Sequence, residues 1–136
     1  MDDGNTLIRV CYADTDAGGV VYHGSYLRYF DQARADWLRH RGFSQQVVKE
    51  QMGLVFAVRA VQLRYCRPAG LDAQLVIRTQ VNESDPTTLR FRQEAWCEQV
   101  LLVEGDVELV CVDLRRWKAA PWPEAIRSTI AAQSAS

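Results

Sequence analysis

The sequence predicts an α+β fold in which an antiparallel sheet of five strands curls around one long helix. One segment, residues 25–41, repeats apolar side chains at intervals of three and four, which is the period of a helix buried on one face. Four later segments alternate apolar and polar residues, as half-buried strands do. The spacers between them are short, whereas a parallel crossover needs a dozen or more residues. The pattern therefore favours an antiparallel meander and excludes a doubly wound parallel sheet.

The N-terminal elements are a strand, a turn and the long helix. Residues 7–12 are apolar and favour a strand, which stops at the Asp- and Gly-rich residues 14–19. The helical stripe carries large side chains such as Trp37, so we expect it to face the sheet. Ser25 is the expected N-cap, and Gly42 suits a left-handed helix end.

The rest of the chain is mostly β. Residues 44–51 predict a short second helix capped by Ser44, and the pattern changes to strand from Leu54 onward. The alternating segments that we expect to form the remaining strands are residues 60–67, 75–81, 89–95 and 101–114. The residues after Trp117 are expected to be loosely held.

A single copy of this sheet would leave its outer face and its edges uncovered. The chain has 136 residues, so we expect residues 1–136 to form one domain. Pairing with a second copy is the simplest way to cover exposed strand edges. We therefore expect a homodimer or a homotetramer.

Composition and charge exclude several classes of protein. Apolar residues make up 48% and charged residues 24%, so the bulk of the chain is not disordered. The formal net charge of -1 lacks the basic excess of a nucleic-acid-binding protein. The longest apolar run, residues 54–58, is far shorter than the ~20 residues of a membrane span. The first residues are acidic and polar, unlike a signal peptide, which predicts a cytoplasmic location.

The cysteines predict no metal or redox site. Their spacing contains no Cys-x-x-Cys pair and no zinc pattern. We expect all of them to be reduced, small apolar residues of the core. They are Cys11, Cys66, Cys97 and Cys111.

The stretch between the first strand and the long helix holds the residues best suited to chemistry. Asp14 and Asp16 lie two positions apart, followed by Gly18, Gly19 and the helix start. Unpaired N–H groups at a helix start stabilise developing negative charge, and a carboxylate supplies a nucleophile or a general base. This combination suits acyl transfer. The same residues are also common in ordinary turns, where one carboxylate caps backbone donors.

Three other motifs fit this stretch poorly. A calcium-binding loop that starts at Asp14 needs Glu at its twelfth position, where Ser25 stands. Haloacid-dehalogenase-like phosphotransferases share a strand followed by Asp-x-Asp, but they need a parallel α/β core. The Gly18-Gly19 pair lacks the spacing of a phosphate-binding loop.

The loop and the first turns of the helix resemble the signature of the 4-hydroxybenzoyl-CoA thioesterase branch of hotdog-fold proteins. The similarity rests on Tyr-x-Asp-Thr-Asp-x-x-Gly-Val-Val-Tyr-His-x-x-Tyr at residues 12–26. Further similar segments include residues 63–69 and 110–113, so the resemblance spans about residues 7–127. Within the branch, the chain resembles the acyl-CoA thioesterases associated with the Tol-Pal cell-envelope system, the YbgC type. The resemblance implies a hotdog fold and thioester hydrolysis.

The resemblance also implies roles for individual residues. Asp16 matches the catalytic carboxylate, which attacks the thioester carbonyl directly or activates water. The backbone N–H of His23 matches an oxyanion donor, and its side chain is a second catalytic candidate for proton transfer or positioning. The residues expected to bind substrate are Gly19, Val20, Tyr22 and Tyr26. No metal and no cofactor is implied.

Other residues of the region have less specific expectations. Asp14 is expected to shape the turn. Tyr22, Tyr26 and Phe30 are candidates for an acyl pocket, although the same spacing suits plain core. Asp31 falls where relatives with a phenolic acyl group place a carboxylate, but its surroundings are of the YbgC type, so we expect a solvated residue. The candidate cations for CoA phosphates, none of them singled out, are Arg59, Arg64, Arg67 and Arg92.

The expected function is hydrolysis of an acyl-CoA to a free acid and CoA, at a site formed between subunits. CoA and acyl-carrier protein both remain candidate carriers of the acyl group. The alternative is a hotdog scaffold that binds acyl-carrier protein or an envelope complex with little catalysis. A hotdog dehydratase fits the Asp-Thr-Asp pattern poorly.

Overall fold

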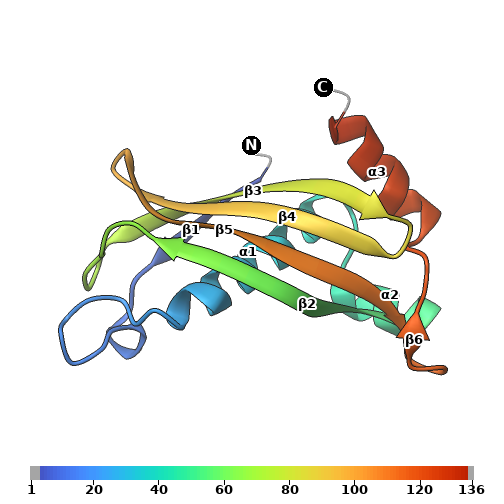
Figure 1. Ribbon diagram of the computed structural model, residues 1–136, viewed down its shortest axis with the longest axis horizontal. Helices are drawn as coiled ribbons and strands as arrows, with labels where there is room; N and C mark the ends of the chain where they lie inside the picture. The colour runs from blue at the N-terminus through green and yellow to red at the C-terminus, as the bar shows by residue number, and fades with distance from the viewer. Residues whose placement is uncertain (1–3, 135–136) are drawn as a thin grey trace.

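The computed structural model describes residues 4–134 and shows an antiparallel sheet curled around a central helix (Figure 1). The strand order is β1-β3-β4-β5-β2, and a short β6 pairs with β5. The strands are β1 (Asn5–Arg9), β2 (Leu54–Tyr65), β3 (Gln74–Asp85), β4 (Thr88–Cys97), β5 (Val100–Asp113) and β6 (Lys118–Ala119). The helical elements are the 3-10 turn η1 (Tyr12–Asp14), α1 (Ser25–His40), α2 (Gln45–Met52) and α3 (Glu124–Ser134). The predicted fold class is confirmed, with β6 as an additional two-residue strand.

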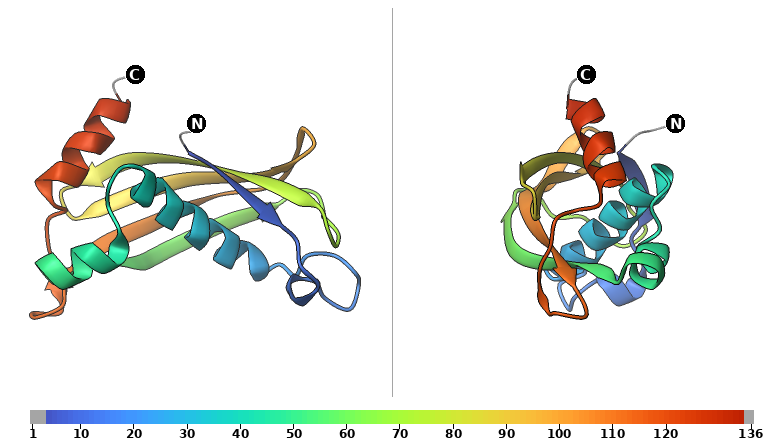
Figure 2. Two further views of the ribbon diagram at one scale, coloured as in Figure 1. Left: turned by 180° about the vertical axis from the view of Figure 1, so that it is seen from behind. Right: turned by 90° about the vertical axis from the view of Figure 1, so that its right-hand side faces the viewer.

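The long helix α1 lies against the concave face of the sheet (Figure 2). One core cluster joins Tyr29 and Phe30 to apolar residues of β1 and β3, and a second joins Trp37 and Leu38 to β4 and β5. Trp37 packs edge-on against Phe91, with ring centroids 5.9 Å apart. Burying each such side chain stabilises the fold by roughly 1.5–3 kcal/mol. The helix thus buries the face that its apolar stripe predicts.

The ends of the helices are close to those predicted, with one correction. The N-cap of α1 is Gly24, not Ser25, and Ser25 is the first helical residue. The Ser25 hydroxyl donates instead to the carbonyl oxygen of Asp14 at 3.0 Å, so it ties the helix start to the preceding loop. Gly42 follows the helix with a φ of 91°, as a left-handed stop requires. The predicted Ser44 cap of α2 is confirmed.

β2 forms an edge of the sheet and begins at Leu54, where the sequence pattern changes to strand, so the alternating segment 60–67 marks only its second half. It spans Leu54–Tyr65, and Leu54 already pairs with Asp113 of β5. The first residues of β2 form an unbroken apolar run, which hides the alternation typical of a strand. Within the sheet β2 has β5 as its neighbour on one side and no strand on the other.

The other strands match the predicted segments to within a few residues, except at the end of the first strand. β1 ends at Arg9, not at residue 12, because Tyr12–Asp14 fold into η1. This early end frees the residues that follow to form the loop before α1.

The residues after Trp117 pack against the body of the protein, which corrects the prediction of a loosely held tail. β6 pairs with β5, and α3 follows. Trp122, Ile126 and Ile130 are each at most 2% exposed and belong to the second core cluster. Their spacing of four residues is typical of one helix face. The Pro and Ser/Ala content of this segment obscures that spacing in the sequence.

The cysteines are free thiols, but the prediction that all four lie in the core is wrong. Cys111 is buried, Cys97 is half-buried, and Cys11 and Cys66 are exposed. Cys11 follows β1 and Cys66 follows β2, so each lies beyond the strand end, where the sheet no longer covers it. Burial raises the pKa of the Cys111 thiol to about 11, and the nearby carboxylate of Asp113 adds to this rise.

Candidate active site

The loop between β1 and α1 is a compact turn around Asp16. The Asp16 N–H donates to the carbonyl of Val20 at 2.9 Å, and the Gly19 N–H donates to the carbonyl of Asp16 at 3.0 Å. Gly19 has a φ of 83°, a left-handed conformation that glycine adopts without strain. The backbone on both sides of Asp16 is therefore fixed by hydrogen bonds.

A second set of contacts docks this loop onto the segment that follows β2. The Val21 N–H donates to the carbonyl of Ala69 at 2.9 Å, and Val20 forms an isolated antiparallel bridge with Gly70. Two segments that are distant in the sequence thereby lie side by side.

Asp14 is the buried carboxylate of the loop. Its Oδ2 accepts hydrogen bonds from the Cys11 N–H at 3.1 Å and the Tyr29 hydroxyl at 3.0 Å, and its Oδ1 pairs with Arg28. Burial by itself raises the pKa of Asp14, but these hydrogen bonds and the charge of Arg28 outweigh it, so the pKa is lowered. Asp14 therefore holds the turn through its hydrogen bonds, as the sequence predicts.

Asp16 is exposed and lines a cavity of about 300 Å³. Its Oδ1 accepts a hydrogen bond from the Gly18 N–H at 2.9 Å, whereas none of residues 4–134 donates to its Oδ2. The cavity is lined by Asp16, Val21, His23, Tyr26, Tyr65, Cys66, Arg67 and Pro68. One carboxylate oxygen is therefore available to a bound molecule.

His23 lines the same cavity and has an unpaired peptide N–H. It lies two positions before Ser25, the first helical residue, and its N–H donates to no acceptor in the described part of the chain. Its carbonyl accepts a hydrogen bond from the Tyr65 hydroxyl at 2.9 Å, which joins the start of α1 to the end of β2. The His23 ring centroid lies 4.3 Å from that of Tyr22 and 6.2 Å from that of Tyr65.

The predicted site residues divide into two groups. Those that the structure brings together in the cavity are Asp16, His23 and Tyr26. Those outside the cavity lining are Tyr22, Gly19 and Val20. Tyr22 still contacts the site through the His23 ring, whereas the other two shape the turn.

In the opposite wall of the cavity, the sequence-based prediction named only Arg67, as a candidate cation for the CoA phosphates. That wall comes from the end of β2 and includes Tyr65 and Cys66. Tyr65 is 42 positions from His23, so no local pattern connects the two. The one sequence feature that could have indicated this wall is the similarity of residues 63–69 to the corresponding segment of the family.

Of the remaining candidates, Arg67 lines this cavity, whereas Phe30, Asp31, Arg59, Arg64 and Arg92 do not. Phe30 is fully buried in the core, and Asp31 is exposed, as expected, with Arg34 3.3 Å away. Arg59 and Arg92 form ion pairs with glutamates of β5 at 2.8 and 2.6 Å. Neither arginine lines the Asp16 cavity.

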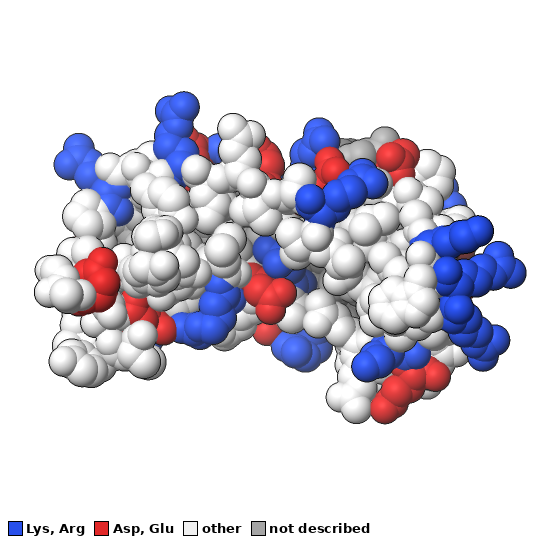
Figure 3. Space-filling view, turned by 60° about the horizontal axis from the view of Figure 1, so that its bottom comes forward, with Lys and Arg blue, Asp and Glu red and all other residues white. Residues whose placement is uncertain are grey.

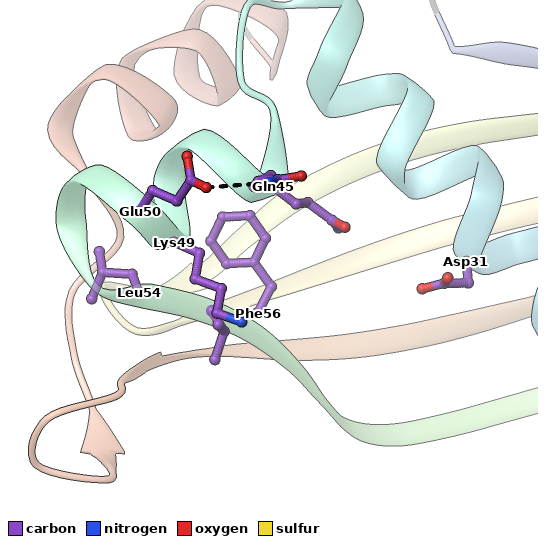
Figure 4. Close-up of a pocket in the computed structure, with 8 residues that line it drawn as sticks. Asp31, Gln45, Lys49, Glu50, Leu54 and Phe56 are labelled. Carbon is purple, nitrogen blue, oxygen red and sulfur yellow. Dashed lines mark hydrogen bonds between the residues drawn. The ribbon is translucent and has the colours of Figure 1, made fainter.

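A second cavity of about 460 Å³ lies at the other end of β2 (Figure 4). Its lining residues are Asp31, Gln45, Gln46, Lys49, Glu50, Leu54, Val55 and Phe56. On the α2 side, the Gln46 amide donates to Glu50 at 3.1 Å. On the β2 side, Phe56 packs on Trp122, with ring centroids 4.5 Å apart. The cavity therefore has a polar wall and an apolar wall.

Between residues 4 and 134, His, Cys, Asp and Glu side chains form no group of three or more that is placed to hold a metal ion. No helix in that range is long and apolar enough to cross a membrane.

The sequence pattern of the Thioesterase-like superfamily matches residues 10–130. The chain belongs to this superfamily. Within it, acyl-CoA thioesterase YbgC of Haemophilus influenzae is 38% identical over 129 residues, which cover 94% of this chain and 95% of that protein. Acyl-CoA thioester hydrolase YbgC of Escherichia coli O6:H1 is 42% identical over 120 residues, which cover 88% of this chain and 89% of that one.

Solved structures show the same relationship. A hypothetical protein from Thermus thermophilus has a TM-score of 0.88 at 33% identity, with 95% of this chain and 98% of that chain covered. A probable thioesterase from Bartonella henselae has a TM-score of 0.83 at 30% identity, with 88% and 98% covered. The predicted hotdog thioesterase family and the prediction of an enzyme are confirmed.

Proposed function

We propose that the protein hydrolyses acyl-CoA thioesters in the cavity that Asp16 lines, so that RCO–S–CoA and water give RCOOH and HS–CoA. The proposal rests on one observation: a carboxylate with an available oxygen and a residue with an unpaired peptide N–H line the same cavity. The names of the YbgC relatives support acyl-CoA as the substrate class.

Asp16 is the proposed nucleophile or general base. In one route its carboxylate attacks the carbonyl carbon, the CoA thiolate leaves, and water hydrolyses the resulting mixed anhydride. In the other, it removes a proton from a water that attacks the same carbon, and the proton passes to the leaving thiolate. Both routes build negative charge on the carbonyl oxygen. The His23 N–H would stabilise that charge, an effect of roughly 100- to 1,000-fold in rate for one donor.

The neighbouring residues have supporting roles in this proposal. The His23 imidazole transfers a proton to the leaving group or positions the substrate. Tyr22 holds the His23 ring by packing on it. Gly19 and Val20 hold the turn that sets Asp16 at the cavity through backbone hydrogen bonds.

We place the complete site between two subunits, because β2 has the properties of a pairing edge. It is twelve residues long, has no neighbouring strand on its outer side within residues 4–134, and exposes Val58, Val61 and Tyr65 by 42–49%. Antiparallel pairing of two β2 strands would set the Leu54 end of one beside the Tyr65 end of the other. The cavity at Leu54 would then adjoin the Asp16 cavity of the second copy, and the two together would hold the acyl group.

Charge supports the same arrangement. Lys and Arg side chains gather at one end of the molecule, the end that holds α2 and β6 (Figure 3). The exposed cations of those segments include Lys49, Arg115, Arg116 and Lys118. In the proposed dimer this end adjoins the Asp16 cavity of the second copy. Positive charge there favours the phosphates of CoA.

Four further properties expected from the sequence remain predictions. These are a homotetramer, a cytoplasmic location, the association with Tol-Pal and the use of acyl-carrier protein as a carrier. Light scattering on the purified protein measures the first of them, and a dimer mass would contradict the tetramer.

Release of free thiol from short, long and aromatic acyl-CoAs tests the proposed function. We expect turnover above background for at least one chain class, and its loss in Asp16→Asn. The binding-module alternative predicts no turnover for any of them. A parent protein that releases no thiol would therefore refute the proposal.

A further inference from the structure

Tyr26 has a buried hydroxyl group that has no hydrogen-bond partner among the described residues. The residue lies in the first turn of α1 and is 3% exposed. Its hydroxyl oxygen is inaccessible, and no described residue forms a hydrogen bond with it. Buried hydroxyls in proteins are usually paired, because an unpaired one loses its hydrogen bonds to water. The unpaired group therefore needs an explanation.

The two tyrosines that pack against Tyr26, unlike Tyr26 itself, have hydrogen-bond partners for their hydroxyl groups. The rings of Tyr29 and Tyr65 pack edge-on against it, with centroids 5.5 and 5.9 Å away. The Tyr29 hydroxyl donates to Asp14, and the Tyr65 hydroxyl donates to the carbonyl of His23. In this group of three, the Tyr26 hydroxyl alone has no partner within residues 4–134.

The position of Tyr26 indicates where its partner would come from. Tyr26 lines the cavity together with Asp16 and His23, and it follows His23 by three positions at the start of α1. Tyr65, which packs beside it and lines the same cavity, is half-exposed. Neighbouring side chains must move before the Tyr26 hydroxyl can meet a bound molecule, because its oxygen is inaccessible in this conformation.

We infer that the Tyr26 hydroxyl donates a hydrogen bond to the carbonyl oxygen of the bound thioester, as a second donor beside the His23 peptide N–H. This inference rests on the proposed function. The carbonyl oxygen is an acceptor that every thioester substrate brings into the cavity, and it gains negative charge during the reaction. Burial, with smaller effects of Tyr65 and Cys97, raises the pKa of Tyr26 to about 12, so the hydroxyl keeps its proton at neutral pH.

Tyr26→Phe tests the inference because it removes one oxygen atom and leaves the ring. We expect kcat/KM to fall by about 100-fold or more, as the loss of an oxyanion donor does. We also expect Tm to rise by about 4 °C, because an unpaired buried hydroxyl is removed. A structural hydroxyl would give the opposite sign of the Tm change.

The matched control is Tyr12→Phe, because Tyr12 is 82% exposed and lies outside the cavity lining. We expect it to leave kcat and Tm unchanged. Parent-like turnover in Tyr26→Phe would overturn the inference, and so would a lowered Tm, which would show that the hydroxyl stabilises the fold.

Binding of unreactive analogues gives a readout that does not depend on turnover. One probe is the ketone in which CH2 replaces the thioester sulfur, and the other is the S-alkyl-CoA thioether of equal length, which lacks the carbonyl. We expect Tyr26→Phe to raise the Kd of the ketone about tenfold and to leave that of the thioether unchanged. Equal effects on both probes, or none, would overturn the inference. Failure of the proposed function would show separately, as a parent protein that binds but does not hydrolyse acyl-CoA.

Discussion

The two sides of the loop before α1 place the same type of residue in opposite environments. Asp14 points inward, where it accepts hydrogen bonds from Cys11 and Tyr29 and pairs with Arg28. Asp16 points outward, where one carboxylate oxygen accepts from Gly18 and the other has no donor among residues 4–134. A carboxylate with all its partners supplied by the fold stabilises that fold. One with an available oxygen beside a cavity is suited to chemistry.

The largest effect that this contrast predicts is on turnover. Asp16→Asn should lower kcat at least 100- to 1,000-fold, because the amide is neither a nucleophile nor a base of comparable strength. The Asn side-chain oxygen can still accept from the Gly18 N–H, so we expect Tm to stay within about 2 °C of the parent. Thiol release and calorimetry on the same preparations measure both quantities. Near-native turnover in this variant would assign the chemistry to another group.

The matched change on the inner side should affect stability. Asp14→Asn keeps the shape of the side chain but removes the charge that faces Arg28 and an acceptor used by Cys11 or Tyr29. We expect the free energy of unfolding to fall by about 2–3 kcal/mol. Urea denaturation measures this loss. An unchanged midpoint would mean that the contacts of Asp14 contribute nothing, and the contrast between the two carboxylates would fail.

The same buried carboxylate predicts a pH dependence of stability. The pKa of Asp14 is lowered by folding, so its contribution is complete above the ordinary value of 3.8 and is lost as pH falls through the lowered value. Below about pH 4, the parent should therefore lose stability more steeply than Asp14→Asn does. Urea titrations between about pH 2 and pH 6 compare the two slopes. Parallel curves would contradict the lowered pKa.

The smallest effect on stability should come from replacing Arg28, the exposed ion-pair partner of Asp14. Arg28 is 57% exposed, so solvent screens its ion pair, and Arg28→Ala should cost about 0.5 kcal/mol or less. The loss should shrink further at high salt. Thermal unfolding at low and high ionic strength measures both effects. A loss as large as that of Asp14→Asn would show that the ion pair, not the hydrogen bonds, holds the loop.

Much of the fold follows from local periodicity. The stripe that includes Phe30 and Trp37 predicts α1, and alternation predicts β3, β4 and β5 to within a few residues. For β2, the change to strand pattern at Leu54 marks the start of the strand, but its first residues form a fully apolar run with no period to detect, so alternation marks only residues 60–67. The packed C-terminal helix was missed because three apolar residues spaced by four, among many small and polar ones, give a weak signal.

The candidate site was predictable only in part. The family resemblance indicated Asp16, His23 and Tyr26, which the structure places around one cavity. Tyr65 completes the opposite wall, and its hydroxyl reaches His23 across 42 positions of sequence. No local pattern predicts such a contact, because it depends on where β2 ends relative to α1.

The element types, the curled antiparallel sheet and the loop that carries two carboxylates can be predicted from the sequence, because they depend on side-chain periodicity and turn chemistry within short segments. Which of the two carboxylates is buried depends on contacts between distant segments. Asp14 points inward because Tyr29, one helical turn into α1, supplies a donor there, and the loop is held in place by Ala69 from beyond β2. The directions of side chains in an irregular loop are set by such long-range hydrogen bonds, which leave no period in the sequence.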